Sequence, residues 1–446
     1  MLAAREHWGS RFGFIMATAG SAIGLGNIWR FPYMAGENGG SAFILIYLAV
    51  VVTFGISLVM AEMVLGRVTQ RNPVGAFRAL GGRGWALAGG LGVLTGFVIL
   101  SFYVVVAGWT LAYMVFMAGN QLPTADPAVL GGHFSGFVGR TFSPLFAATI
   151  FMGLTAWIVA GGVGKGIERA SKVLMPLLFV LLLVLVARSV TLPGADPGLA
   201  FLLTPDFSRV TIDTIISATA QAFFSLSIGM GVMITYGSYL PRNVNIPRST
   251  LIIVLLDVGV AVLAALMVLP AVFAVGLDPS AGPGLTFITL PAVFASMPFG
   301  NLFGTLFFAL LAIAALTSAV SILEPMIAWA VDEHGIGRGA ATLAASLVCL
   351  LLAIPASLSF GPLSDATLAG KTFFDWMDFL ANNVMLPLGG LLVASFVGWR
   401  WAKPACTHLT NDGTLRLPWL TAWIWLLRVG APVAIVALVW QAVSTS

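Results

Sequence analysis

The sequence predicts an all-α polytopic membrane protein whose transmembrane helices form two inverted halves. Three observations lead to this prediction. The 446 residues are 59% hydrophobic and 9% charged, whereas about 25% of the residues in a typical soluble domain are charged. Apolar runs of about 20 residues, the length that crosses the hydrocarbon core of a bilayer, recur along the chain. Two of these runs are interrupted by glycines at corresponding places, as expected of repeated halves.

Eleven runs are long enough to be transmembrane helices. The connections 119–142 and 189–212 are rich in Pro, Gly and Asp and are expected to be exposed loops. The stretch from Leu285 to Met297 is apolar but too short to span, so we expect a re-entrant or interfacial helix there. The expected spans are residues 11–35, 41–66, 86–118, 143–161, 168–188, 213–240, 248–275, 301–331, 341–359, 373–399 and 420–443.

The distribution of Lys and Arg predicts the orientation, because cytoplasmic loops carry an excess of these residues. The N-terminus is therefore expected inside and, with an odd number of spans, the C-terminus outside. The basic residues expected on the cytoplasmic side are Arg5, Arg11, Arg67, Arg71, Arg78, Arg83, Lys165, Arg169, Lys172, Arg242, Arg248, Arg338, Arg400, Lys403 and Arg416. Those expected on the other side are Arg140, Arg188, Arg209 and Lys371.

The first span is interrupted between Gly20 and Asn27, a stretch with three glycines. Each glycine disfavours a helix interior by about 1 kcal/mol relative to alanine. At mid-bilayer depth, backbone groups released from a helix cannot face lipid, so they must line a polar cavity or bind something. We therefore expect these carbonyls and amides to form a binding site.

The second interruption runs from Ser225 to Gly231, in the sixth span. Five spans per half turn the second half upside down, and paired interruptions in inverted halves are typical of the midplane site of secondary transporters. We expect an N-terminal repeat over residues 1–190 (spans 1–5), a C-terminal repeat over 191–400 (spans 6–10) and an additional span within 401–446. The alternative is that the glycines only allow close helix packing.

Ionisable side chains inside a membrane are costly and usually functional. Arg30 follows the first interruption toward the outside, and Asp378 lies at the outer end of the tenth span, so we expect them to pair over the site. On the cytoplasmic side Arg5 is expected to pair with Asp332. Snorkelling of these side chains to the interface remains the alternative.

Further polar residues inside the spans suit the support of a broken helix or the binding of a cation. Glu62 could accept hydrogen bonds from the free amides of a break. Asp257, beside unwound carbonyls, would make a site for a monovalent cation, since hard cations take oxygen ligands. Ala314, Thr317 and Ser318 share one helix face and could add oxygen ligands. The alternative for the two hydroxyls is bonding to their own helix carbonyls.

A set of motifs covers nearly the whole chain. They are Arg-Glu-His-Trp at 5–8, Gly20 to Asn27, Trp-Arg-Phe-Pro-Tyr at 29–33, Glu-Asn-Gly-Gly at 37–40, Gln-Ala-Phe-Phe-Ser-Leu-Ser at 221–227, Ile-Thr-Tyr-Gly-Ser-Tyr at 234–239, and Thr317-Ser318 with Pro-Met-Ile-Ala at 325–328. Together they resemble the neurotransmitter:sodium symporter family (solute carrier 6 type). Within this family the chain is similar to bacterial eleven-span transporters for leucine and other hydrophobic amino acids, whereas most members have twelve spans.

The resemblance implies two sodium ions. The first would be held by the Ala22 carbonyl, Asn27, Ser225, Asp257 and the carboxylate of the substrate. The second would be held by the Gly20, Ile23 and Ala314 carbonyls with Thr317 and Ser318. Relatives often have Thr and Asn at the Ser225 and Asp257 positions. Gly166 and Pro176 resemble a family motif in which the inner end of the fifth span unwinds to hydrate the second sodium.

The resemblance also implies an amino acid substrate. Its carboxylate would meet the amides near Leu25 and Gly26 and the Tyr103 hydroxyl, and its ammonium the carbonyls around Ala22 and Phe224 and the Ser227 hydroxyl. Amine-transporting members place an Asp where this chain has Gly24, which favours a free amino acid here. The side-chain pocket, expected to suit a bulky apolar or aromatic residue, would be lined by Ile99, Phe224, Met230, Ala319 and Ile322.

Chloride-dependent relatives need an anion near the first sodium. Here Asp257, expected near Tyr47, Gln221 and Ser225, already supplies a negative charge at that place. We therefore expect no chloride requirement.

These expectations combine into a sodium-coupled amino acid symporter of the bacterial inner (cell) membrane that works by alternating access. Arg30, Asp378 and Phe224 would close the outside, and Arg5 with Asp332 the inside. Its partners would be the lipid bilayer and the substrate, with no nucleic acid, in a monomer or weak dimer. No nucleophile, base and orienting group cluster at one depth of the membrane, so we do not expect an enzyme. The alternatives are a symporter of the same fold for an osmolyte or amine, and a sodium channel or non-transporting sensor.

Overall fold

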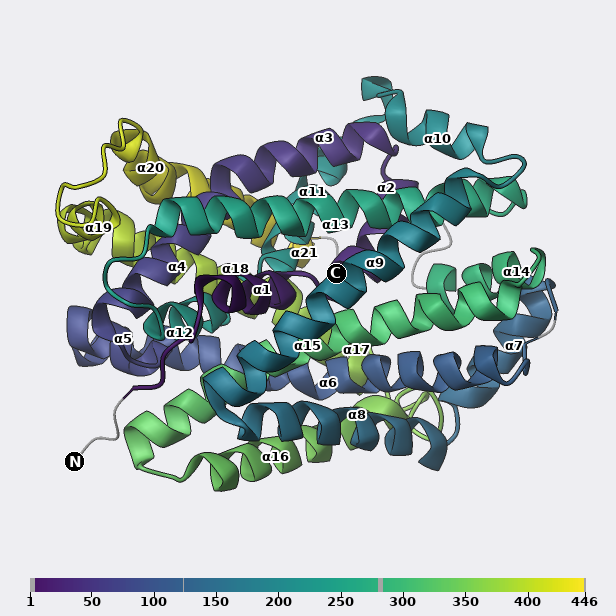
Figure 1. The fold of residues 1–446 in the computed structure, drawn as a ribbon, viewed down its shortest axis with the longest axis horizontal. Coiled ribbons are helices and arrows are strands. Elements are labelled where there is room, and N and C mark those ends of the chain that lie inside the picture. Colours follow the sequence, from purple (N-terminus) through teal and green to yellow (C-terminus); the bar gives the residue numbers. More distant parts are fainter. Residues whose placement is uncertain (1–4, 123, 280–283, 445–446) are drawn as a thin grey trace.

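The computed structural model describes residues 5–122, 124–279 and 284–444. Within these ranges the chain is helical, and the only β-type pairing is an isolated bridge between Leu368 and Lys371. Figure 1 shows α6, α8 and α16 along one side of the bundle and α3 and α13 along the opposite side. The first helix, α1 (Arg11–Ala22), lies between these two sides, where it packs against α9, α13 and α15.

In the described residues, nine helices are long and apolar enough to cross a membrane, and a tenth span is the bent pair Arg11–Ala22 and Gly26–Glu37. The expected sixth span is instead two helices separated by a non-helical stretch, so the expected total of eleven remains a prediction. The nine are Ser41–Thr69, Arg83–Ala118, Phe142–Ala160, Val163–Val190, Ile246–Ala274, Gly300–His334, Arg338–Leu358, Phe373–Arg400 and Leu420–Gln441.

Several spans contain a π-helical or 3-10 turn, so they consist of more than one element. They are α3 (Ser41–Val50), η2 (Val51–Gly55) and α4 (Ile56–Thr69); η3 (Arg83–Trp85) and α6 (Ala86–Ala118); η4 (Val163–Glu168) and α9 (Arg169–Val190); α17 (Phe373–Phe379), η7 (Leu380–Met385), α18 (Leu386–Ser395) and η8 (Phe396–Arg400); and α20 (Leu420–Trp425), η9 (Leu426–Gly430) and α21 (Ala431–Ser444). The other spans are each a single helix: α8 (Phe142–Ala160), α13 (Ile246–Ala274), α15 (Gly300–His334) and α16 (Arg338–Leu358).

Short helices lie in the connections. The apolar stretch from Leu285 is a short helix, as its length predicts, made of η6 (Leu285–Thr289) and α14 (Leu290–Ala295). The others are α5 (Pro73–Gly81), α7 (Pro127–Val138), α10 (Asp196–Leu203), η5 (Phe207–Arg209) and α19 (Ala402–Leu409).

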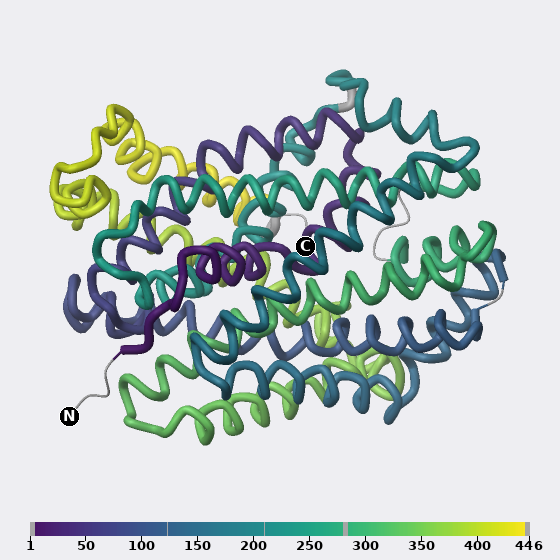
Figure 2. Tube along the Cα trace, viewed as in Figure 1, coloured from purple at the N-terminus to yellow at the C-terminus, as the bar shows by residue number. Residues whose placement is uncertain are grey.

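Both glycine-rich stretches interrupt their helices. α1 ends at Ala22, the next helical turn η1 (Gly26–Arg30) leads into α2 (Phe31–Glu37), and the two parts are bent by 51°. In the sixth expected span α11 (Ile212–Ser225) is separated from α12 (Val232–Ser238) by six residues. Gly229 has a φ of 89° there, a conformation that glycine adopts without the penalty of a side chain. The tube in Figure 2 shows the first interrupted helix inside the bundle.

The helices α4 and α12 approach each other closely at two glycines. A Cβ atom on Gly66 would lie 1.9 Å from the carbonyl oxygen of Ile234, and one on Gly237 would lie 2.6 Å from that of Met63. Such contacts bring the two backbones together as in other small-residue helix interfaces of membranes. The second half of the sixth span is therefore fixed against the second span.

Candidate functional site

The peptide groups released at the first break face polar side chains, one from the turn after the break and two from neighbouring helices. The Gly24 amide points to Asn27 Oδ1 at 3.3 Å, and the Leu25 amide points to the Tyr103 hydroxyl, on α6, at 3.4 Å. The Gly26 carbonyl accepts a hydrogen bond of 2.8 Å from Gln221 Nε2, on α11. The break thus offers amides on one side and carbonyls on the other inside a buried site, and groups of this kind bind anions and cations respectively.

Asp257, on α13, is fully buried beside this break. Its carboxylate accepts hydrogen bonds from Asn27 Nδ2 at 2.7 Å and from the Tyr47 hydroxyl at 3.3 Å. The Ser225 hydroxyl, at the last residue of α11, lies 2.9 and 3.0 Å from its two oxygens. Among the described residues no Lys, Arg or His pairs with this carboxylate. A buried charge of this kind is costly unless it is paired or binds a cation.

A second group of oxygen atoms lies on the other side of the break. The Ser318 hydroxyl is 3.3 Å from the carbonyl oxygens of both Gly20 and Ile23, and 3.2 Å from that of Ser21. The Thr317 hydroxyl bonds to carbonyls of its own helix, including Ala314 at 3.1 Å. Thr317 therefore shows the alternative left open for it, in which the hydroxyl bonds to its own helix. Ser318, in contrast, bridges from α15 to the break.

Of the residues expected to bind substrate, all but one line a small cavity between the two breaks. Ala319 is the exception: it is buried on α15 but is not part of the lining. The cavity measures about 20 Å³ and is lined by Ser21, Ala22, Gly24, Leu25, Gly26, Ile99, Tyr103, Phe224, Ser225, Ser227, Met230, Ser318 and Ile322.

A larger cavity of about 360 Å³ adjoins the small one and shares Leu25, Tyr103 and Phe224 with it. Arg30 and Asp378 both line this cavity, but they form no ion pair in the described part of the chain. The Arg30 guanidinium lies over the Phe224 ring, 5.2 Å from its centre, and Asp378 accepts a hydrogen bond of 2.7 Å from Asn382. The expected pairing of Arg30 with Asp378 is thus not made in this conformation.

At the opposite end the expected pair is made. Arg5 forms an ion pair with Asp332 and donates a hydrogen bond of 2.5 Å to the Ser238 hydroxyl. Trp8 donates a bond of 3.1 Å to the Tyr236 carbonyl. The chain before α1 is therefore bound to α12 and to the end of α15, and it closes this end of the site.

Two acidic residues at this end were missed by the sequence analysis. Glu324, on α15 and fully buried, forms an ion pair of 2.5 Å with Arg338 and accepts a bond of 2.6 Å from the Tyr239 hydroxyl. Glu168 accepts bonds from the Gly9 amide at 2.6 Å and the Ser10 hydroxyl at 2.8 Å. Both lie within expected spans, so the cost of an intramembrane charge was the signal that could have identified them.

Glu62, on α4, supports the second break. It is fully buried, and its Oε1 accepts a hydrogen bond of 2.8 Å from the Gly229 amide. That amide lies in the non-helical stretch and has no helical carbonyl to bind. Glu62 therefore occupies the position that the sequence analysis expected for it.

We expect Glu62→Ala to lower the free energy of unfolding by about 1–3 kcal/mol, because it leaves the buried Gly229 amide without an acceptor. Glu62→Gln is the matched control, since its side-chain oxygen can still accept this bond. Thermal unfolding of the three purified proteins in one detergent measures the difference. Equal midpoints for the Ala and Gln variants would show that the bond does not stabilise the break.

The sequence that forms this site also matches a known family. Residues 5–129 and 144–446 match the model of the sodium:neurotransmitter symporter family. The chain belongs to this family. Sodium:neurotransmitter symporters are membrane transporters and not enzymes, and membership establishes a sodium-dependent transporter with several membrane spans.

Similarities to individual proteins support this family assignment. The chain is 44% identical over 431 residues to the sodium-dependent transporter YhdH of Bacillus subtilis (strain 168), covering 96% of each protein. It is 33% identical over 456 residues to the sodium-dependent transporter MJ1319 of Methanocaldococcus jannaschii, covering 98% of this chain and 90% of the relative. The crystal structure of MhsT in complex with L-phenylalanine matches with a TM-score of 0.91 and 47% identity, over 98% of this chain and 100% of MhsT.

Proposed function

We propose that this sodium:neurotransmitter symporter imports hydrophobic or aromatic L-amino acids together with sodium. The observation that carries the proposal is the Asp257 carboxylate, which is buried beside open backbone groups; its hydrogen-bond donors in the described part of the chain are all neutral. A monovalent cation at this place would neutralise the charge. The similarity to MhsT, whose structure contains L-phenylalanine, supports an amino acid as the co-substrate.

The two oxygen clusters suit two sodium ions. The first would bind at Asp257, Asn27, Ser225 and the Ala22 carbonyl, next to the carboxylate of the substrate. The second would bind at Ser318, where three carbonyl oxygens of the break already converge within 3.3 Å. Thr317 and the Ala314 carbonyl complete this second set. Moving one charge into the cell is worth about 2.3 kcal/mol per 100 mV, so two ions would drive strong accumulation.

The amino acid would bind between the breaks. Its carboxylate would meet the Leu25 amide and the Tyr103 hydroxyl, which lie 3.4 Å apart. Its ammonium would meet the carbonyls around Ala22 and Phe224 and the Ser227 hydroxyl. Gly24 leaves room for the carboxylate that a free amino acid brings, and the adaptable Met230, with Ile99 and Ile322, would receive an apolar side chain.

The conformation of the two ends suits a transporter open toward the side of Arg30 and Asp378. In the proposed cycle, this pair and the Phe224 ring close over the bound substrate, and the pair of Arg5 and Asp332 then separates. The two interrupted helices and their partners would rock against a scaffold around the fixed site. The N-terminus would lie in the cytoplasm and the C-terminus outside, and the bilayer would be the inner membrane of a bacterium.

Uptake into proteoliposomes tests the proposal. The full chain is reconstituted, an inward sodium gradient is imposed, and the twenty radiolabelled amino acids are screened for accumulation, with a potassium gradient as control. We expect sodium-dependent accumulation of apolar or aromatic amino acids. Accumulation of an amine or osmolyte in their place, sodium currents without a substrate, or binding without accumulation would each contradict the proposal.

We also expect uptake to be independent of chloride, because the Asp257 carboxylate supplies the negative charge beside the first sodium. Replacing all chloride by gluconate at constant sodium should change the initial rate of uptake by less than about twofold. A relative that requires chloride, assayed in the same vesicles, provides the control. A large loss of uptake in gluconate would contradict the role given to Asp257.

A further inference from the structure

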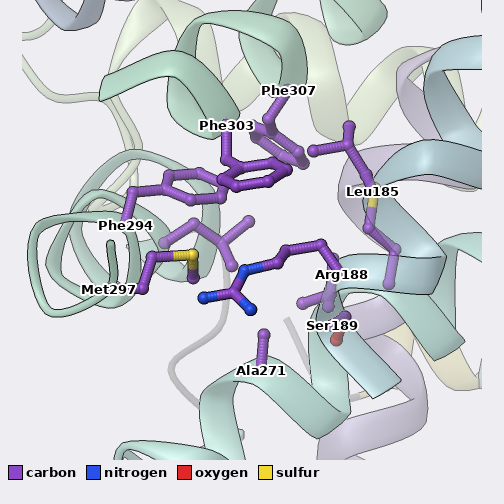
Figure 3. Close-up of a pocket in the computed structure, with 11 residues that line it drawn as sticks. Leu185, Arg188, Ser189, Ala271, Phe294, Met297, Phe303 and Phe307 are labelled. Atoms are coloured by element: carbon purple, nitrogen blue, oxygen red, sulfur yellow. The ribbon is translucent and has the colours of Figure 1, made fainter. Parts of the chain in front are cut away.

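A separate cavity holds a basic side chain that has no anionic partner among the residues that the structure describes. This cavity, drawn in Figure 3, measures about 20 Å³ and lies where α9, α13 and α15 meet the short helix α14. Arg188 and Ser189, at the end of α9, are the polar residues of its lining, and the remainder is apolar. Neither residue takes part in the proposed transport site.

The Arg188 guanidinium reaches into the middle of this lining. In Figure 3 the rings of Phe294, Phe303 and Phe307 lie on one side of it and Ala271 on the other. Its Cζ is 5.5 Å from the centre of the Phe303 ring. Across residues 5–122, 124–279 and 284–444, the Arg188 guanidinium makes no ion pair and no hydrogen bond; the residue is partly exposed, and its Nε is buried. A cation next to apolar side chains without a counter-charge is costly.

Ser189 is a second donor that lacks an acceptor in the same cavity. It is 3% exposed, and its hydroxyl has no hydrogen-bond partner within the described part of the chain. Other hydroxyls of this region bond to a carbonyl four residues earlier: Ser171 to Ile167 and Thr191 to Ala187, both at 2.8 Å. Two adjacent donors, one of them charged, therefore lack an acceptor at the same place.

We propose that this cavity binds one small inorganic anion, such as chloride, between the Arg188 guanidinium and the Ser189 hydroxyl. A volume of about 20 Å³ has room for a small occupant, since a water molecule needs about 10–15 Å³. A water molecule would satisfy Ser189 but would leave the charge of Arg188 unpaired. If Arg188 reached toward lipid headgroups by snorkelling, its charge would have a partner, but the Ser189 hydroxyl would still lack an acceptor.

This anion site is separate from the first sodium site. Met267, which lines the cavity, follows Asp257 by ten residues of α13, or about 15 Å of helix. An anion there would not balance the charge of the transported sodium. It would connect the end of α9 to α14 and so stabilise the folded protein. The expected effect is therefore on thermal stability and not on uptake.

Thermal unfolding of the full chain in detergent without added phospholipid tests this site. At constant sodium, replacing gluconate by chloride should raise the midpoint by about 2 °C, because an anion that binds only the folded state stabilises it. The rise should disappear in Arg188→Gln and become smaller in Ser189→Ala. Arg140→Gln, at an exposed arginine in the connection between α7 and α8, is the matched control and should keep the full rise.

Crystals grown in sodium bromide provide a second readout that does not depend on the stability of variants. We expect an anomalous peak between the Arg188 guanidinium and the Ser189 hydroxyl. Three results would overturn the proposal. The first is that the midpoint of thermal unfolding does not depend on halide and no anomalous peak is found. The second is that Arg188→Gln shows the same halide effect as the unmodified protein, and the third is that anionic phospholipid and not halide raises the midpoint, which would assign a lipid phosphate to Arg188. Neither thermal unfolding nor anomalous diffraction depends on uptake, so both would still test the anion site if the proposed symport were wrong.

Discussion

Replacing Asp257 by Asn is expected to weaken the sodium affinity of uptake about 30-fold to 3000-fold. The carboxylate is fully buried and its neighbours Asn27, Ser225 and Tyr47 are neutral, so its charge is the main attraction for a cation at this place. Truncating one partner of a buried charge pair costs about 2–5 kcal/mol, and each 1.4 kcal/mol is about tenfold in affinity. The measurement is the sodium concentration for half-maximal uptake in proteoliposomes.

Chloride provides the discriminating control for this variant. If Asp257 acts through its charge, chloride should partly restore uptake to Asp257→Asn, while it leaves the unmodified protein unchanged. Asp365→Asn, at an exposed carboxylate in the connection after α16, should retain normal sodium dependence. Unchanged sodium affinity in Asp257→Asn would exclude this carboxylate from the first sodium site.

Gly24→Ala is expected to lower the affinity for an apolar amino acid about 10-fold to 100-fold. The added methyl group would lie 2.4 Å from the Ser318 hydroxyl oxygen and 3.2 Å from that of Tyr103. It would therefore occupy space between the break and α15 that the substrate carboxylate is proposed to use. Overpacking a close-fitting site costs about 1–3 kcal/mol, which corresponds to this loss of affinity. Equilibrium binding of radiolabelled phenylalanine at saturating sodium measures it.

The matched control for Gly24→Ala is Gly153→Ala, in the middle of α8. A Cβ atom at Gly153 meets nothing within 4 Å, so this variant should bind like the unmodified protein and be slightly more stable. Thermal midpoints of both variants separate a loss of binding from a loss of folding. Normal binding by a folded Gly24→Ala protein would contradict the placement of the substrate at this break.

The sequence located the interrupted helices but not the residues that leave the helix. Glycine composition pointed to the whole range from Gly20 to Asn27, yet α1 continues to Ala22 and the chain is helical again from Gly26. Gly20 lies within α1, where its carbonyl accepts a hydrogen bond from the Ser318 hydroxyl and its backbone packs against Thr317 and Met175. Propensity therefore indicates where a helix can break, while contacts from distant helices decide where it does.

The pairing of charges was only partly accessible from the sequence. Positions along the spans indicated which ends Arg5, Asp332, Arg30 and Asp378 share. In the proposed cycle the two pairs form at different times, so the sequence does not determine which pair a given conformation contains. The cavity at Arg188 could not be expected from sequence either, because its lining comes from four elements that lie far apart in the chain.

The close contact of α4 with α12 has a consequence for motion. Each glycine of that contact rests on a carbonyl of the other helix, so neither helix can slide along its neighbour without a steric clash. The second span and α12, the second half of the sixth expected span, must then move as a single rigid body. A tilt of α12 would be transmitted through the hydrogen bond between Glu62 and Gly229 to residues 226–231, which face the proposed substrate. A large movement at the end of α12 would then be coupled to a small displacement of these residues at the centre of the membrane.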